Sequence, residues 1–253
     1  MNWVGLYTFI RHEIKRMLRV FGQTILSPLI SATLYIFIFG FVIGGRIDLI
    51  AGIKYITFVF PGILMLNIIS SSFAHSSSSV FFARFVKSIE ELLVAPLSYF
   101  EIVSGYVLGA VARAFIVAFG ILVVGIFFDA VTLYHPFLFI LHVIAIAIIF
   151  SLLGILIGLW AKNFEQLGAI NIFVITPLTY LGGIFYSVHM LPAKIQFLTY
   201  SNPFFYFVDG IRNSMVGINE ANTIVGFSII VGLIIFLGIL VIHLFKIGWR
   251  IRP

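Results

Sequence analysis

Long uncharged stretches limit what this chain can fold into more than any other feature of its sequence. Residues 20–45, 55–83 and 130–161 contain no Asp, Glu, Lys or Arg, and the same holds for residues 166–193 and 221–245. The shortest of these stretches has 25 residues and the longest has 32. A transmembrane helix needs about 20 consecutive, mostly apolar residues. Each stretch therefore holds one membrane span, and none comfortably holds two.

A further stretch, residues 102–128, contains a single charge, Arg113. The chain is 62% hydrophobic and 9% charged, whereas a soluble domain is about 45–50% apolar and about 25% charged. Continuous apolar runs such as residues 144–150 argue against a β-barrel, whose strands alternate. We predict a single all-α polytopic domain, residues 1–253, with six transmembrane helices. The spans are expected at about residues 22–45, 55–82, 99–128, 137–160, 167–187 and 222–246.

The distribution of Lys and Arg predicts the orientation of the chain. An even number of spans places both termini on one side, which then carries Arg11, Lys15, Arg16, Arg19, Arg84, Lys87, Lys162, Lys246, Arg250 and Arg252. The opposite side carries Arg46, Lys54, Lys194 and Arg212. By the positive-inside rule both termini are cytoplasmic. This asymmetry explains most of the net charge of +6, so we expect no nucleic-acid partner. The first apolar run is too long for a signal-peptide core and is treated as a retained span.

Residues 1–20 have the pattern of a basic amphipathic helix. Apolar side chains recur at spacings of three and four residues, and cations fill much of the remainder. The apolar set is Trp3, Leu6, Ile10, Ile14, Met17 and Phe21, and the basic set is Arg11, His12, Lys15, Arg16 and Arg19. Such a helix is suited to lie in the cytoplasmic headgroup region. Periodicity alone favours an anchor for the first span over contact with a cytoplasmic partner.

The loop at residues 84–97 predicts a short helix between the second and third spans. Ser88 precedes Glu91 by three residues and Ser98 precedes Glu101 by three, which are two capping-box patterns. The first would start a helix over residues 89–94. Pro96 follows two residues later and disfavours its continuation. The second would cap the third span. Two adjacent carboxylates facing an anionic leaflet are unfavourable. A protein partner explains them better than lipid does.

Polar residues within the predicted spans are candidates for lining a transport pathway. The second span combines Asn67 and His75 with Ser70, Ser71, Ser72, Ser76, Ser77, Ser78 and Ser79. Serine in a membrane helix bonds to its own turn and allows close packing, so the serines indicate either packing or a wetted wall. Arg113 lies 15 residues after Ser98, roughly 22 Å along a helix. We therefore place it near the bilayer centre, facing protein or water, with Asn67 or the serines as partners.

Small residues and aromatic residues mark two further features. Gly105 and Gly109, like Gly154 and Gly158, are pairs at spacing four that predict tight helix packing, within or between subunits. Residues 191–219 form a long, barely polar outer loop. Its uncharged part, residues 195–208, is too short to span, and it predicts short helices that re-enter the outer leaflet. Aromatic residues there form either an interfacial belt or an exit for an amphiphile. The aromatic pathway candidates are Tyr180, Tyr186, Phe204 and Phe205.

Catalytic and metal sites are not expected in this chain. The sequence has no Gly-x-x-x-x-Gly-Lys phosphate loop and no His-Glu-x-x-His or Glu-x-x-His metal pattern. It also lacks a Gly-x-Ser-x-Gly elbow and has no cysteine. We therefore predict no catalytic residue, no bound metal and no cofactor in this chain.

Three segments together resemble a known family. They read IEELLVAPL at residues 89–97, TPLTYLGGIFYSVHMLP at 176–192 and NPFFYFVDGIR at 202–212. With the basic helix and six spans, they are similar to the permease subunit of bacterial type-two ABC exporters, in particular the YadH-like group of inner-membrane permeases. The resemblance covers essentially the whole chain.

The resemblance implies a half-transporter in the bacterial cytoplasmic membrane. Two copies would form the pore, and two separate ABC ATPase subunits would bind ATP and magnesium below it. The helix that couples the ATPase to the membrane would comprise Ser88, Ile89, Glu90, Glu91, Leu92, Leu93, Val94, Ala95 and Pro96. Its carboxylates are expected to meet basic residues of the ATPase, and Leu92 and Leu93 to fill an apolar groove. A second, weaker ATPase contact would comprise Arg11, Glu13, Lys15 and Arg16.

The sequence does not select the substrate. Phe, Tyr and Ser suit an amphiphile, so we favour export of a lipid-like or drug-like molecule. Export of a polysaccharide or glycolipid by the same family is an alternative. A secondary transporter or channel is the alternative from another class.

Overall fold

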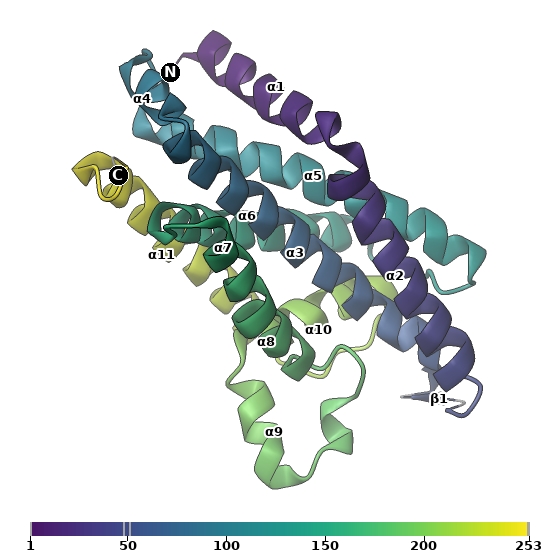
Figure 1. The fold of residues 1–253 in the computed structure, drawn as a ribbon. Helices are drawn as coiled ribbons and strands as arrows, with labels where there is room; N and C mark the ends of the chain where they lie inside the picture. Colours follow the sequence, from purple (N-terminus) through teal and green to yellow (C-terminus); the bar gives the residue numbers. More distant parts are fainter. Residues whose placement is uncertain (1, 48, 51, 252–253) are drawn as a thin grey trace.

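The computed structural model describes residues 2–47, 49–50 and 52–251 and contains a bundle of helices with one small hairpin (Figure 1). Arg252, one of the cations used to predict orientation, lies outside the described residues. In chain order the elements are α1 (Trp3–Arg19), η1 (Gly22–Leu26), α2 (Ser27–Phe37), η2 (Ile38–Ile43), β1 (Leu49–Ile50), β2 (Ile53–Lys54), α3 (Tyr55–Phe85), α4 (Ser88–Val94), α5 (Tyr99–Phe127), α6 (Pro136–Trp160), α7 (Phe164–Ile170), η3 (Asn171–Ile175), α8 (Thr176–Leu181), η4 (Val188–Met190), α9 (Ala193–Tyr200), α10 (Pro203–Val216) and α11 (Thr223–Ile247).

Within the described residues, five helices are long and apolar enough to cross a membrane. They are Gly22–Ile43, Tyr55–Phe85, Tyr99–Phe127, Pro136–Trp160 and Thr223–Ile247. Their bounds agree with five predicted spans to within one helical turn. The fold is therefore an all-α polytopic membrane protein, as the charge-free stretches predicted.

The predicted span at 167–187 differs most from the structure. α7, η3 and α8 form a continuous helical run of 18 residues, 164–181, with a π-helical turn in the middle. The run ends at the Gly182–Gly183 pair, where Gly183 has φ +81°, a conformation that residues with a side chain rarely adopt. The helix therefore ends earlier than predicted, and its status as a sixth span remains a prediction.

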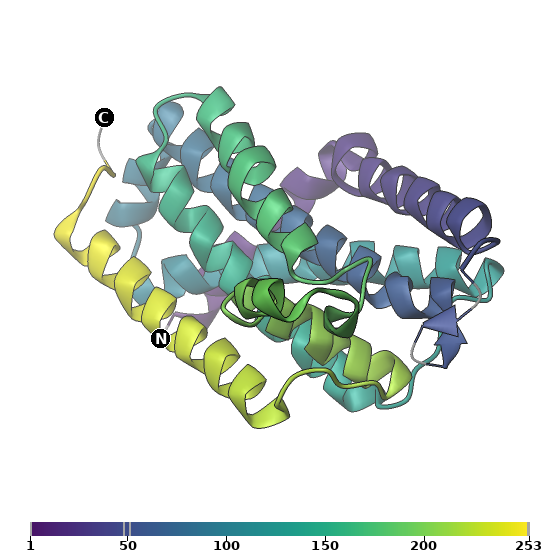
Figure 2. The ribbon, with the colours of Figure 1, turned by 90° about the horizontal axis from the view of Figure 1, so that it is seen from below.

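α3 forms the centre of the bundle. It packs against α5 and α6 along most of its length, and α10 packs against α3 and α6. In its most apolar window 83% of the residues are buried, compared with 17% for Gly22–Ile43 and 22% for α11. Figure 2 shows α2 and α11 at opposite edges of the bundle. These two helices therefore offer the largest apolar surfaces to surroundings outside the chain.

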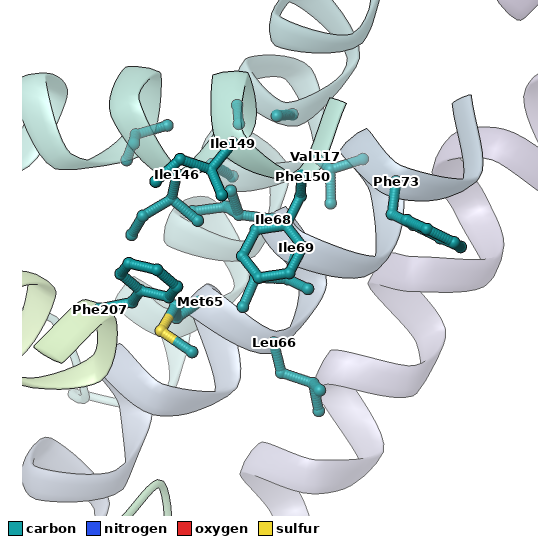
Figure 3. Packing of buried hydrophobic residues seen from close by; sticks show 14 of the residues in the cluster. Met65, Leu66, Ile68, Ile69, Phe73, Val117, Ile146, Ile149, Phe150 and Phe207 are labelled. Atoms are coloured by element: carbon teal, nitrogen blue, oxygen red, sulfur yellow. The ribbon is translucent and has the colours of Figure 1, made fainter. Parts of the chain in front are cut away.

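The core is an apolar contact between helices distant in sequence (Figure 3). Met65 and Ile69 of α3 meet Ile146 and Phe150 of α6, and Phe207 of α10 packs beside them. All five side chains are almost completely buried. Because lipid tails are as apolar as these side chains, the stabilisation comes mainly from close van der Waals packing.

Small residues allow α3 and α6 to approach each other closely. A Cβ at Gly154 would lie 2.6 Å from the carbonyl oxygen of Phe73, and one at Gly158 would lie 2.8 Å from that of Ser77. Between them the hydroxyls of Ser76 and Ser151 are 2.6 Å apart and share a hydrogen bond. The predicted glycine pair therefore packs within one chain, and the serine-rich stretch supplies the opposing small surface.

The two ends of the bundle differ in what they carry. Figure 1 shows both termini and α4 at one end, and the β1–β2 hairpin and α9 at the other. Elements expected on the cytoplasmic side and elements expected outside are thus separated by the length of the long helices.

Candidate functional site

α4 is the short helix that the sequence predicted between the second and third spans. It begins at Ser88, immediately after Lys87, whose φ of 61° turns the chain sharply out of α3. The hydroxyl of Ser88 donates to the carbonyl of Ala83 at 3.4 Å, so the predicted capping box from Ser88 to Glu91 is wrong. The second capping box is confirmed, because Ser98 and Glu101 bond reciprocally at the start of α5.

The side chains of α4 divide into a covered face and an open face. Ile89 is buried, and Leu92 and Leu93 pack, half-buried, against the core of their own chain. The expected fit of Leu92 and Leu93 into a groove on a partner remains a prediction. The open face, here named the α4 surface, consists of Lys87, Glu90, Glu91 and Val94. These four recur at helical spacing, and Val94 is 87% exposed.

α1 is tied to the segment that follows α4. The backbone N–H of Asn2 donates to the carboxylate of Glu101, and the Asn2 side chain donates to the carbonyl of Pro96 at 3.3 Å. Further along, Phe9 fills the notch at Gly105 and meets the edge of Tyr106 with ring centroids 4.9 Å apart. α1 therefore packs against α5, and its position in the headgroup region remains a prediction.

The buried face of α1 matches the predicted apolar face only in part, because Leu6 and Met17 are buried and Ile10 and Ile14 are half-buried. The residues buried there are Leu6, Phe9, Glu13 and Met17, whereas Trp3 is 69% exposed. The notches at Gly105 and Gly109 of α5 accept Phe9 and Glu13, and this contact rotates the helix. Hydropathy alone could not predict that a carboxylate would lie on the covered side.

Glu13 is the centre of a buried polar cluster between α1 and α3. Its Oε2 lies 3.2 Å from Nε2 of His75 and 3.0 Å from a guanidinium nitrogen of Arg16, and it accepts a hydrogen bond from Ser79 at 2.7 Å. We name Glu13, Arg16, His75 and Ser79 the Glu13 cluster. Burial alone would raise the pKa of the Glu13 carboxyl, but contacts with His75, Arg16 and Ser79 outweigh it and hold the pKa at about 2.

This burial corrects the expectation that Glu13 contacts an ATPase, because only 3% of its surface is exposed. Arg16, from the same expected contact, is half-buried in the Glu13 cluster. Arg11 and Lys15 are exposed and stay available for a partner.

Arg113 lies on α5 beside the Glu13 cluster and is 8% exposed. Its expected hydrogen bonds are absent, because Asn67 donates to the carbonyl of Ile63 at 2.8 Å and Ser71 donates to the carbonyl of Asn67. Both polar side chains are thus bonded within their own helix. Nε of Arg113 has no hydrogen-bond partner among the described residues.

The depth of Arg113 in the membrane remains a prediction. α5 has 29 residues and is about 43 Å long, which exceeds the roughly 30 Å thickness of the hydrocarbon core. Arg113 follows one turn after Gly109, which contacts Glu13 of α1.

The other pathway candidates occupy two kinds of place. Asn67, Ser71 and His75 are buried in the packing of α3, and Phe204 and Phe205 are buried on α10. Tyr180 lies at the contact of α8 with α2, where its hydroxyl is 3.1 Å from that of Tyr35, and the Tyr186 hydroxyl donates to the carbonyl of Leu181 at 3.0 Å. The structure thus groups His75 with Arg113 but does not bring all the candidates to one surface. Their role in a pathway remains a prediction.

α10 is anchored inside the outer half of the bundle by Arg212, which is fully buried. Its guanidinium donates to the carbonyl of Gly183 at 2.7 Å and lies 3.9 Å from the ring centroid of Phe58. Asp209, one turn earlier, accepts hydrogen bonds from the backbone of Glu220 and Ala221 before α11. In the charge count Arg212 was only one of the cations expected on the outer side, so its burial was not predicted. The one sequence feature that could have indicated a structural role is its place in the NPFFYFVDGIR segment.

Comparison with known proteins agrees with this architecture. The family model for "ABC-2 type transporter" membrane domains matches residues 5–216. The chain is 39% identical over 253 residues to the inner membrane transport permease YadH of Escherichia coli (strain K12), covering 100% of this chain and 98% of that protein. It is 26% identical over 218 residues to nodulation protein J of Rhizobium meliloti (strain 1021), covering 85% and 82%.

The family match covers most of α1, the open face of α4 and the anchored α10, and the similarity to YadH extends over the whole chain. Since the described chain also contains five helices suited to crossing a membrane, the protein belongs to the ABC-2 type transporter family as a membrane permease.

Proposed function

We propose that this chain is the permease subunit of an ATP-driven exporter in the bacterial inner membrane. Two copies would form the translocation unit, and two ABC ATPase subunits would bind ATP and magnesium. The observation that carries the proposal is the α4 surface, which is exposed, acidic and located at the end of the bundle that holds both termini. The similarity to an inner membrane transport permease supports it.

The α4 surface suits a protein partner better than it suits lipid. Glu90 and Glu91 would lie next to an anionic leaflet, which repels carboxylates. Val94 would leave an apolar side chain in water if nothing covered it. A basic groove with an apolar patch on the ATPase complements both features. Arg11 and Lys15 on α1 supply a second, weaker contact.

A sixth span and cytoplasmic termini complete the proposed topology. Five crossings would place the termini at opposite ends, whereas Figure 1 shows them at the same end. This supports a crossing by residues 164–181, a run that rises about 27 Å. The excess of Lys and Arg at that end supports its cytoplasmic placement.

The face of residues 164–181 is the proposed contact between two copies of the chain. Ile172 and Phe173 are exposed on this run. Gly168 on the same run has open space beside it. Small residues are enriched where membrane helices meet. α11 instead presents an apolar surface suited to lipid.

We favour an amphiphilic, lipid-like or drug-like substrate. Exposed apolar side chains on α2, together with Ile195, Phe197 and Leu198 on α9, offer surfaces that suit such a molecule. A small ion would need a polar lining instead. α9 lies at the proposed outer end, where a substrate would leave (Figure 1).

The test is reconstitution of the purified permease with an ABC ATPase that co-purifies with it. We expect candidate lipids, glycolipids or drugs to stimulate ATP hydrolysis and to be moved only when ATP is present. A permease that purifies without an ATPase and transports with an ion gradient alone would contradict the proposal. A response to glycolipids but not to lipids or drugs would overturn the favoured substrate class only.

A further inference from the structure

A cavity of about 420 Å³ opens where three helix ends meet, at the end of the bundle with both termini. It is lined from α3, from the end of α6 with its following turn, and from the segment after α11. The lining residues are Phe81, Arg84, Phe85, Trp160, Ala161, Lys162 and Arg250. It lies apart from the α4 surface and the Glu13 cluster, since it shares no residue with either.

Three cations line this cavity, and none of the described lining residues is a carboxylate. In the part of the chain that the structure describes, no ion pair involves Arg84, Lys162 or Arg250. Arg84 and Arg250 are close enough to repel each other. Such an arrangement is unfavourable beside apolar surface unless an anion occupies the space between the charges.

Helix capping explains only part of the arrangement. Arg84 donates to the carbonyls of Gly158 and Ala161 at 2.9 and 3.2 Å, and Arg250 donates to that of Trp160 at 2.9 Å. Both therefore satisfy carbonyls at the end of α6. Each uses one terminal nitrogen for this, and a guanidinium has five N–H donors. Nε of Arg84 is buried and has no partner among the described residues.

Aromatic side chains give the cavity an apolar wall. Phe85 is 69% exposed, Trp160 is 41% exposed, and Phe164 stands beside them with its ring centroid 6.2 Å from that of Phe85. Trp is typical of the membrane–water boundary, where one end of the side chain is apolar and the other is wet. A small inorganic anion needs no such wall, whereas the acyl chains of a lipid do.

We propose that this cavity binds the phosphate headgroup of an anionic phospholipid from the cytoplasmic leaflet, with its acyl chains against Phe85 and Phe164. The cations would hold the headgroup phosphate, and the lipid would join the ends of α3, α6 and α11. The proposal rests on the cytoplasmic orientation of this end. Basic pockets between membrane helices on that side bind anionic headgroups in this way.

The test measures lipid retained by the full purified chain in native mass spectrometry. Mixed micelles would contain either phosphatidylglycerol or phosphatidylcholine with the same acyl chains. We expect phosphatidylglycerol to be retained preferentially, and Lys162→Gln to weaken its retention about fivefold for the loss of one charge. The Lys162 ammonium makes no hydrogen bond in the described structure, so this variant leaves the fold intact.

Lys246→Gln is the matched control, because Lys246 is exposed at the same end of α11 but does not line the cavity. Equal retention of both lipids, or unchanged retention in both Lys162→Gln and Arg250→Gln, would overturn the proposal. Displacement of phosphatidylglycerol by millimolar inorganic phosphate would show a free-anion site instead. If Lys162→Gln weakened ATPase association but left lipid retention unchanged, the cavity would be a contact site for the ATPase and the proposal would be wrong. The lipid measurement needs neither ATPase nor transport, so failure of the proposed export function would be seen separately.

Discussion

At the scale of single residues, Glu13 shows how tertiary contacts change the meaning of a charge. In the sequence it belongs to a basic amphipathic segment, and that position predicts an exposed carboxylate. In the structure it lies against Gly109 of α5, forms an ion pair with Arg16 and lies 3.2 Å from Nε2 of His75. A buried carboxylate is tolerable only with such partners, because desolvation of an isolated charge costs several kcal/mol. The Glu13 cluster therefore attaches the N-terminal helix to the centre of the bundle.

Replacing Glu13 should loosen this attachment. Glu13→Gln leaves His75 and Arg16 without the anion, and we expect a loss of stability on the order of 3 kcal/mol. Thermal unfolding of the purified protein in lipid discs would measure the loss. Glu90→Gln, an exposed carboxylate on α4, is the matched control and should unfold like wild type. Equal midpoints for both variants would show that the cluster contributes little.

The same carboxylate predicts a dependence of stability on pH. The pKa of Glu13 is lowered from 4.5 to about 2 in the folded chain. A lowered acid pKa adds stability that is fully present above pH 4.5 and is lost as the pH falls toward 2. We expect Glu13→Gln to reduce the fall in unfolding midpoint over that acid range. A variant with an unchanged acid profile would contradict the assigned ionisation.

Arg113 supplies the other prediction at this scale. We expect Arg113→Leu to lower ATP-driven transport or thermal stability, because intramembrane charges are usually retained for function and this is the one charge in residues 102–128. Arg113→Lys should be only partly tolerated, since Lys lacks the planar guanidinium fork. Transport in proteoliposomes and unfolding midpoints would be measured for both variants. If Arg113→Leu assembles and transports like wild type, the charge is incidental.

At the scale of elements, α4 and the α3–α6 contact have different origins. α4 forms from a local signal, a short polar helix stopped by Pro96, although its N-terminus comes from Lys87 in a left-handed conformation instead of the Ser88 cap. The α3–α6 contact depends on Gly154 and Gly158 facing backbone atoms of another helix. The fold of α4 should therefore tolerate changes on its open face. At the α3–α6 contact, even an added methyl group should destabilise the bundle.

Reversing the charge of the α4 surface should disrupt the complex. We expect Glu90→Lys combined with Glu91→Lys to abolish ATPase association or to uncouple ATP hydrolysis from transport, because both side chains are exposed toward the proposed partner. Pull-down of the ATPase and coupled transport would be measured. Asp129→Lys changes an exposed carboxylate at the opposite end of the bundle, beside Lys54, and should leave both intact. Wild-type behaviour of the double variant would mean that α4 only rests on the membrane.

Adding a methyl group at the α3–α6 contact should destabilise the bundle. The Cβ of Gly154→Ala would lie 2.6 Å from the carbonyl oxygen of Phe73, and backbone cannot move aside as a side chain can. We expect a cost of about 1–3 kcal/mol in thermal unfolding. Gly232→Ala on α11 meets no atom within 4 Å and should be neutral or slightly stabilising. Similar midpoints for both variants would refute the close contact.

At the scale of the whole molecule, the distribution of burial indicates where further subunits belong. α3 is enclosed on nearly all sides, whereas the edge helices and residues 164–181 leave large apolar faces open. An apolar face alone does not separate lipid from a second copy. We propose that a second copy covers residues 164–181, where Ile172 and Phe173 are exposed and Gly168 has open space beside it.

Cross-linking through introduced cysteines would test the proposed pairing of two copies. The natural chain contains no cysteine, so each variant carries a single reactive site. We expect Phe173→Cys to form a disulfide-linked dimer in oxidised membranes, because Phe173 is 77% exposed on the proposed contact face. Phe236→Cys is equally suitable chemically and 63% exposed, but it lies on α11 and should stay monomeric. The reverse pattern would place the dimer contact at α11.

The sequence by itself determined the five long apolar helices, the short helix after α3 and the start of α5 at Ser98. These features depend on interactions within one or two turns, such as a run of apolar residues, a capping box or a proline. They can be predicted without knowing which elements become neighbours. The end of α8 at Gly182–Gly183 was also signalled locally, although the helix stops earlier than predicted.

Only the tertiary structure decided which faces meet and which charges become internal. Glu13 and His75 are far apart in sequence, as are Arg84 and Arg250, and their proximity follows from how whole helices pack. The rotation of α1 depends on two glycine notches in α5, and Arg212 is buried because α10 folds back between α3 and α6. Such contacts are selected by the fit of one helix surface into another, which no local pattern along the chain encodes.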